Sequence, residues 1–166
     1  QRETVGRFDG RYLGIDPDAA GEGPDYDASS TAITGAYVGS FLDRLTNTFG
    51  YRTDMHYRLS AREGADFKWD WSHESPQRGW GRNQNVADVT VDLSAAMRTN
   101  PHLRVLSLNG YYDMATPFHS TERDLKHMML EPKLQPNLQF TYYPAGHMIY
   151  LNPEALHQMR LDLERF

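Results

Sequence analysis

Residues 103–113 read LRVLSLNGYYD, and residues 138–150 read LQFTYYPAGHMIY. Each stretch opens on a short, mostly apolar run of the kind that forms a strand buried on both faces. Each run gives way to turn-forming residues and then to a side chain suited to proton transfer, Asp113 in the first stretch and His147 in the second. We therefore predict two buried strands that end in polar loops.

A helix is expected between these strands, which we place at 103–109 and 138–143. Thr116 stands where a helix cap is expected, with Pro117 at the first helical position. A strand, a helix and a second strand form a right-handed crossover, so the strands are expected to be parallel with both carboxyl ends at one edge. The inner face of the helix is expected to carry Phe118, Thr121, Leu125, Met128 and Met129.

A final helix is expected to start at Asn152, Pro153 and Glu154, because Asn caps a first turn and Pro fits the first helical position. The order strand, helix, strand, helix predicts an α/β fold. The residues of this last helix expected to point inward are Leu156, Met159 and Leu163.

Asp113 and His147 lie 34 residues apart (147 − 113 = 34), a spacing that one helix and one strand fill. Both follow the carboxyl ends of the expected parallel strands, where ligands and catalytic groups of such sheets gather. A carboxylate that accepts the Nδ1 proton of His147 would leave Nε2 to take a proton from a nucleophile. Two plainer interpretations stay open: Asp113 caps a turn, and His147 is an ordinary loop histidine.

Composition excludes several classes of protein. The 166 residues, 39% of them hydrophobic, are enough to bury a core. The formal net charge is −5 with Lys and Arg scattered along the chain, so nucleic acid is not expected as a partner. No apolar run approaches the roughly 20 residues that span a bilayer, and no membrane is expected as a partner. The absence of cysteine excludes disulfides, a catalytic thiol and cysteine zinc sites.

The amino-terminal part is less regular. Residues 1–30 are rich in Gly, Pro and Asp, which predicts a long surface loop. From 30 to 49, apolar residues recur every four positions and predict a helix. The residues that mark its apolar face are Ile33, Tyr37, Phe41 and Leu45, with Val38 and Leu42 beside them.

The segment 51–80 contains all three tryptophans and is expected to be irregular around aromatic anchors, Trp69, Trp71 and Trp80. Asn85 is then expected to cap a helix that ends before Pro101. The residues that share one face of this helix are Val86, Val89, Leu93, Ala96 and Met97.

The sequences NGYYDMATPFHSTERDLKHM (109–128) and YYPAGHMIY (142–150) resemble the carboxyl-terminal segment of serine carboxypeptidases, in particular their bacterial members, which are α/β-hydrolases. The resemblance rests on GYYD-x-ATPF, on AGHM-x-Y and on their spacing, and it extends more loosely over 86–110. It implies that 98–166 form the carboxyl-terminal part of an α/β-hydrolase fold. It also implies that 1–97, including GRFDGRY, form a mainly helical cap insertion over the active site.

The resemblance further implies a Ser-Asp-His triad in which Asp113 is the aspartate and His147 the histidine. Met148 matches the methionine that lines the pocket for the departing residue, and Tyr112, next to Asp113, is expected to wall the same cleft. The implied substrate is a peptide that loses its carboxyl-terminal amino acid, with no cofactor and no metal. The family resemblance suggests a secreted or periplasmic protein, although the residues themselves leave the compartment open.

The nucleophile of that family lies in a G-x-S-x-G motif, and this chain has no such pentapeptide, since Gly39-Ser40 is followed by Phe41-Leu42. We therefore expect a carboxyl-terminal fragment of a serine-type carboxypeptidase that is inactive alone and whose partner is the missing amino-terminal half. Two strands would also leave an open sheet edge, which that half, a second copy of the chain or a rearranged segment would cover.

Two alternative functions stay open from the sequence. Without its nucleophile the chain could be a non-catalytic module that binds a ligand or a partner, and an α/β-hydrolase esterase would use the same triad. His119 and His127 are eight residues apart and could face one way, but no carboxylate completes a ligand set, so no metal is expected.

Overall fold

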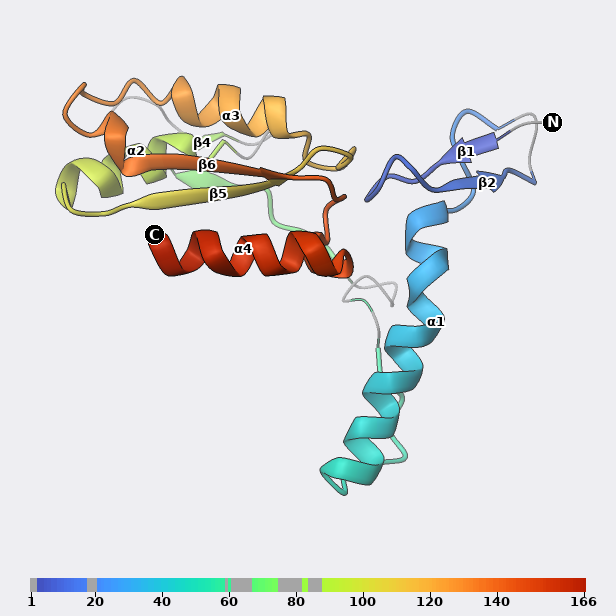
Figure 1. Ribbon diagram of the computed structural model, residues 1–166. Coiled ribbons are helices and arrows are strands. Elements are labelled where there is room, and N and C mark those ends of the chain that lie inside the picture. Colours follow the sequence, from blue (N-terminus) through green and yellow to red (C-terminus); the bar gives the residue numbers. More distant parts are fainter. Residues whose placement is uncertain (1–2, 18–20, 59, 61–66, 75–81, 84–87) are drawn as a thin grey trace. The chain divides into compact units, whose positions relative to one another are not determined.

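The computed structural model describes residues 3–17, 21–58, 60, 67–74, 82–83 and 88–166. The chain mixes helices with short strands (Figure 1). The chain divides into two compact units. Their boundaries differ from the predicted boundary at residue 97, because the amino-terminal residues belong to the same unit as the carboxyl-terminal part. The first unit comprises Gln1–Ile33 and Thr90–Phe166, and the second unit comprises Thr34–Val89.

A parallel pair of strands, β5 (Val105–Gly110) and β6 (Leu138–Tyr143), forms the centre of the first unit. The helix α3 (Phe118–Lys126) lies on one face of the pair, and α4 (Pro153–Arg165) lies on the other (Figure 1). The predicted order of strand, helix, strand and helix is therefore confirmed, as is the parallel pairing. The first unit has an α/β arrangement.

Both strands of the pair end at the same edge, because parallel strands run in one direction. Gly110, the last residue of β5, lies opposite Tyr143, the last residue of β6. The loops that carry Asp113 and His147 leave the sheet from these two residues, so the pairing register brings the loops together.

Two small hydrophobic clusters hold the helices against the strands. One is built from α2 (Thr90–Thr99) and from the segment that follows α3, and its buried members are Met97, Met128, Leu130 and Leu134. The other lies between the end of β6 and α4, and its buried members are Tyr143, Ala145, Ile149 and Ala155. The hydroxyl of Tyr143, a residue only 1% exposed, donates to Asp162 of α4 at 3.0 Å and so ties this helix to the strand.

The helix expected after Thr116 is present, but Thr116 does not cap it. No side chain caps the amino terminus of α3, and the carbonyl oxygen of Pro117 accepts from Ser120 and Thr121 instead. Met129 was also predicted wrongly as an inner residue. It is 80% exposed, because α3 ends at Lys126 and the backbone reaches a positive φ of 52° at Met129.

The start of α4 is as predicted, since the side chain of Asn152 accepts from the N–H groups of Glu154 and Ala155. The buried face of the helix was assigned wrongly in part. Leu156 and Leu163 are 43% and 49% exposed. Met159 is partly buried against the cluster, as predicted, and Ala155, which was not predicted, is the buried residue of the helix.

The long surface loop predicted for residues 1–30 is wrong in part. Glu3–Val5 (β1) and Leu13–Ile15 (β2) pair as an antiparallel hairpin, in which Thr4 is buried. Gly6, Asp9 and Gly10 lie in the connection between these strands, where the N–H of Gly6 donates to the carbonyl of Tyr12 at 2.8 Å.

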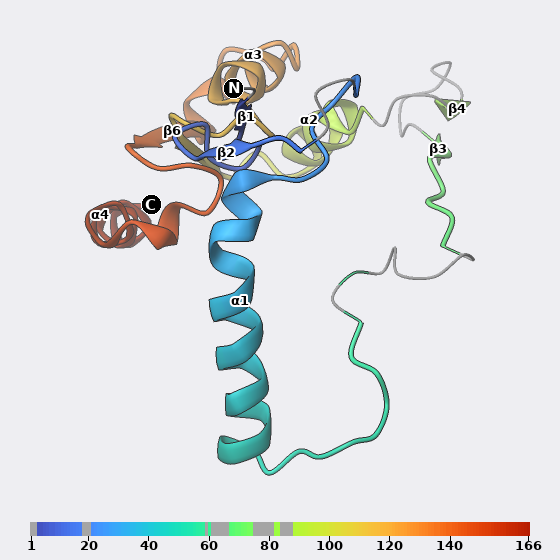
Figure 2. The ribbon, with the colours of Figure 1, turned by 90° about the vertical axis from the view of Figure 1, so that its right-hand side faces the viewer.

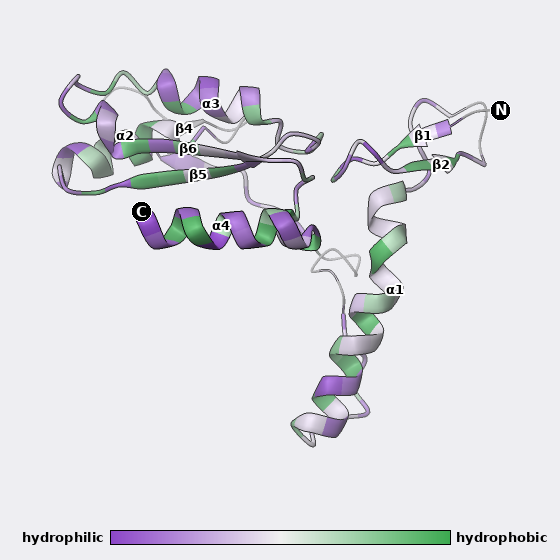
Figure 3. Cartoon of the chain, viewed as in Figure 1, coloured by the Kyte–Doolittle hydropathy of each residue, from purple (hydrophilic) through white to green (hydrophobic). Residues whose placement is uncertain are grey.

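The helix predicted over 30–49 is confirmed as α1 (Ala28–Asp43), which begins in the first unit and continues as a π-helical segment, η1 (Arg44–Thr48) (Figure 2). Hydrophobic residues recur along α1, as Figure 3 shows. They are not packed into a core of the described residues, since Tyr37 is 49% and Phe41 43% exposed.

In the second unit, the two tryptophans among the described residues contact each other with their rings tilted by 56°. Trp69 and Trp71 are more than half exposed, with ring centroids 5.9 Å apart, and Trp80 lies outside the described residues. Two short strands follow, β3 (His73–Glu74) and β4 (Arg82–Asn83), which pair in antiparallel fashion.

The start of α2 differs from the prediction, while its end at Thr99, before Pro101, agrees with it. The expected cap Asn85 and the apolar Val86 lie outside the described residues, and α2 begins at Thr90. Within the described part of the chain, no helix combines the length and the apolar character needed to cross a membrane.

Candidate active site

Three loops of the first unit meet at the carboxyl edge of β5 and β6: residues 110–116, 144–148 and 6–12. We name them the three-loop cluster. Backbone hydrogen bonds join all three, and the sequence predicted the first two but not the third. The bonds between loops run from Tyr112 N to Ala145 O at 3.0 Å, Gly10 N to Tyr112 O at 2.8 Å, His147 N to Phe8 O at 2.7 Å and Met114 N to Arg7 O at 3.1 Å.

Two glycines allow these loops to approach so closely. A Cβ on Gly110 would lie 2.2 Å from the carbonyl oxygen of Gly146, and a Cβ on Gly146 would lie 2.4 Å from that of Phe8. Neither distance is compatible with a side chain, since backbone atoms cannot easily move aside. The glycine before His147 therefore makes room for the third loop.

Asp113 is the buried centre of the cluster, with 6% of its surface exposed. Its Oδ1 accepts from the backbone N–H groups of Ala115 at 2.8 Å and Thr116 at 2.9 Å. Its Oδ2 accepts from the Thr116 hydroxyl at 2.6 Å and lies 2.7 Å from Nδ1 of His147. The structure thus brings Asp113 and His147 into direct hydrogen-bond contact.

These bonds keep the carboxylate ionised. Burial raises the pKa of Asp113, but the hydrogen bonds from the hydroxyl and N–H of Thr116, from His147 and from the N–H of Ala115 outweigh it. The pKa of Asp113 is therefore below its ordinary value, and a negative charge faces the imidazole.

The hydrogen-bond pattern assigns the tautomer of His147. An ionised carboxylate only accepts, so Nδ1 of His147 must carry the proton that it shares with Asp113. In the neutral ring this leaves the lone pair on Nε2, which makes no hydrogen bond with the described residues. The side chain is 43% exposed, so Nε2 can act as a base toward a bound group.

The third loop holds His147 from the other side. The ring of Phe8 packs against the imidazole at a centroid distance of 5.3 Å, tilted by 51°. The backbone N–H of His147 donates to the carbonyl oxygen of the same phenylalanine. Phe8 therefore fixes both the main chain and the ring plane of His147.

An ion pair stiffens this loop. Asp9 accepts from the Arg11 guanidinium at 2.7 Å, and the same arginine donates to the carbonyl oxygen of Pro144 at 3.2 Å. Burial raises the pKa of Asp9, yet the bonds and charge of Arg11 and the N–H of Gly146 leave that pKa below its ordinary value. The pKa of Arg11 is raised, first of all by its hydrogen bond to Asp9.

The two residues expected to bind substrate flank the Asp113–His147 pair without a hydrogen bond to it in the described structure. The ring of Tyr112, 40% exposed, lies under the Arg11 guanidinium at 4.4 Å from its centroid. Met148 is partly buried where the chain turns into a short 3-10 helix, η3 (Ile149–Leu151). Both border the cluster, and their binding role stays a prediction.

Sequence reasoning missed four side chains of the cluster: Phe8, Asp9, Arg11 and Thr116. For Thr116 a signal existed. An aspartate side chain at a turn commonly accepts from the backbone N–H groups two and three residues later, and a threonine at the third position can also donate its hydroxyl to that carboxylate. Asp9 and Arg11 pair locally, two residues apart, but the contacts of Phe8 with His147 and of Arg11 with Pro144 span more than 100 residues and leave no local signal.

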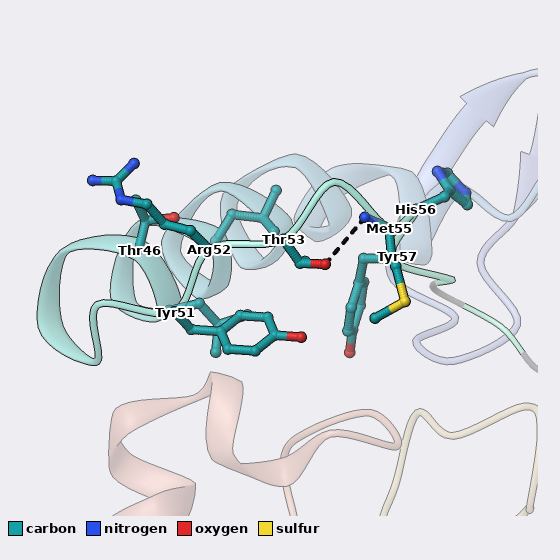
Figure 4. A pocket seen from close by; sticks show the side chains of 9 residues that line it. Thr46, Tyr51, Arg52, Thr53, Met55, His56 and Tyr57 are labelled. Carbon is teal, nitrogen blue, oxygen red and sulfur yellow. Dashed lines mark hydrogen bonds between the residues drawn. The ribbon is translucent and has the colours of Figure 1, made fainter.

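A separate pocket of about 530 Å³ lies in the second unit (Figure 4). Tyr51 and Tyr57 flank it, and the N–H of Met55 donates to the Thr53 hydroxyl at 3.1 Å. Among the described residues that line it, His56 is the only histidine and none is a carboxylate. The pocket thus lacks an acid–base pair. Among the described residues, no three potential metal ligands gather anywhere.

Comparison of the chain with protein-family models, with curated proteins and with solved structures finds no match.

Proposed function

We propose that this chain supplies the aspartate and histidine of a serine carboxypeptidase-like hydrolase with an α/β-hydrolase fold. The observation that carries the proposal is the contact of 2.7 Å between Asp113 and Nδ1 of His147, at the carboxyl ends of two adjacent parallel strands. Burial of the carboxylate and exposure of the histidine are the arrangement that a general base requires. The motif resemblance around these residues selects the peptide-cleaving class.

In the proposed mechanism a serine outside this chain is the nucleophile. Nε2 of His147 takes its proton as the oxygen attacks the last peptide carbonyl, and Asp113 stabilises the imidazolium. The imidazolium then gives that proton to the amine of the departing amino acid. Water, deprotonated by the same nitrogen, next cleaves the acyl-enzyme and restores the serine.

The sheet is consistent with a partner segment that carries this serine. Among the described residues β5 is hydrogen-bonded to β6 alone, so its other edge can accept a further strand. We propose that an amino-terminal half of the same protein occupies this edge and places its serine near Nε2 of His147. Peptide is the proposed substrate, with Met148 and Tyr112 at its binding cleft.

Hydrolysis of an amino-terminally blocked dipeptide tests the proposal, with this chain alone and with the chain joined to the coding sequence that precedes it. We expect activity only in the longer form. There Asp113→Asn should lower kcat by about 10⁴-fold, because the histidine loses its partner. Asp124→Asn, at an exposed ion pair with Arg123, is the matched control and should keep full activity.

The alternatives have distinct outcomes. Nearly full activity of Asp113→Asn would contradict the assignment of the triad. Cleavage of esters but not of blocked dipeptides by the longer form would identify an esterase. No hydrolysis of either substrate would favour the non-catalytic binding module.

A further inference from the structure

The hydroxyl of Thr116 lies between the two members of the Asp113–His147 pair. It donates to Oδ2 of Asp113 at 2.6 Å and lies 3.2 Å from Nδ1 of His147. Since its proton points to the carboxylate, its oxygen can only accept from Nδ1. The imidazole N–H thus faces two acceptors, the carboxylate oxygen and the hydroxyl oxygen.

We propose that Thr116 is a positioning residue of the pair, whose hydroxyl holds Oδ2 of Asp113 in line with Nδ1 of His147. The proposal deepens the proposed function, on which its catalytic meaning rests. The contact itself is a property of this chain and can be tested without hydrolysis.

The need for such a group follows from how Asp113 is held. The backbone N–H groups of Ala115 and Thr116 both bond Oδ1, so they fix only one of the two oxygens. The torsion about the Cβ–Cγ bond of a carboxylate is broad, and hydrogen bonds to one oxygen restrain it less than hydrogen bonds to both oxygens do. Apart from Nδ1–H of His147, the Thr116 hydroxyl is the one donor to Oδ2 among the described residues, and it restrains the plane independently of the histidine.

A helix cap, the ordinary role of a threonine here, does not account for the contact. No side chain caps α3, and the hydroxyl faces the dyad. The turn at Asp113 uses the backbone N–H of Thr116, which any residue but proline provides. The turn and the hydroxyl contact are therefore separable by substitution.

Thr116→Val keeps the backbone N–H and the branched shape but removes the hydroxyl, whereas Thr116→Ser keeps the hydroxyl. The matched control is Thr121→Val, which makes the same change on α3. Carbon-13 and nitrogen-15 NMR would follow the titration of the Asp113 carboxyl group and the Nδ1–H signal of His147, from about pH 6 down to the onset of acid unfolding.

We expect Thr116→Val to raise the proton affinity of Asp113 by about tenfold, close to one pH unit, because the carboxylate loses a charge-assisted hydrogen bond. The Nδ1–H signal should shift and broaden as the carboxylate plane loosens. Thr116→Ser and Thr121→Val should both match the wild type. Should Thr116→Val unfold, Thr116→Ala makes the same test.

Two results would overturn the proposal. One is a folded Thr116→Val or Thr116→Ala protein whose Asp113 titration and Nδ1–H signal equal those of the wild type. The other is a change in Thr116→Val that Thr116→Ser shares, which would indicate a role for the methyl group. Because no step requires turnover, failure of the carboxypeptidase assay would leave the NMR result standing.

Discussion

Glycines and tyrosines occur both in the three-loop cluster and in the second unit, yet their surroundings differ. In the cluster, backbone atoms of other loops occupy the space where a Cβ of Gly110 would lie, whereas no atom lies within 4 Å of a Cβ added to Gly39. Tyr143 at the base of the cluster is 1% exposed, and Tyr37 is 49% exposed. The same residue type is thus a structural requirement in one region and a replaceable surface group in the other.

Alanine substitutions at Tyr143 and at Tyr37 should give the largest difference in the free energy of unfolding. Tyr143→Ala should lower the free energy of unfolding by about 3–5 kcal/mol, because it leaves a cavity and removes the partner of Asp162. Tyr37→Ala should change it by no more than about 0.5 kcal/mol. Urea unfolding of both variants measures the difference, and equal losses would show that α1 is packed as tightly as β6.

Alanine substitutions at Gly110 and at Gly39 should change the free energy of unfolding in opposite directions. Gly110→Ala places a methyl group against two backbone oxygens and should cost about 1–3 kcal/mol or more. Gly39→Ala lies in the exposed part of α1 and should add about 0.5–1 kcal/mol, because alanine favours the helix. A stabilising Gly110→Ala, measured by thermal unfolding, would contradict the close approach of the loops.

Acid should weaken the cluster by a smaller amount. Asp9 and Asp113 both have pKa values below the ordinary one, so each adds stability that is complete above an unfolded pKa of about 3.9. That stability is lost as pH falls through the lower, folded values. Asp113→Asn removes one of these groups, so its unfolding free energy should fall less steeply between about pH 5 and pH 3 than that of the wild type. Parallel pH profiles would contradict the ionised state of Asp113.

Most of the α/β core could be predicted from local sequence. The apolar runs before Gly110 and Pro144 gave both strands within one or two residues, and Asn152 marked the start of α4 correctly. These features depend on neighbours a few residues away, which is what propensity and periodicity record. The errors at Leu156 and Leu163 arose because helical spacing relates both leucines to Met159 as well as it relates Ala155 to Met159, and only packing decides between these residues.

The sequence by itself determined the two strands, the helix between them and the placement of an aspartate and a histidine at one sheet edge. Only the tertiary structure decided that Asp113 and His147 share a proton, that Thr116 joins them instead of capping α3, and that Phe8 packs on the imidazole. The reason is physical: strands and helices follow from interactions between near neighbours, whereas these contacts require three loops to fit together at the glycines.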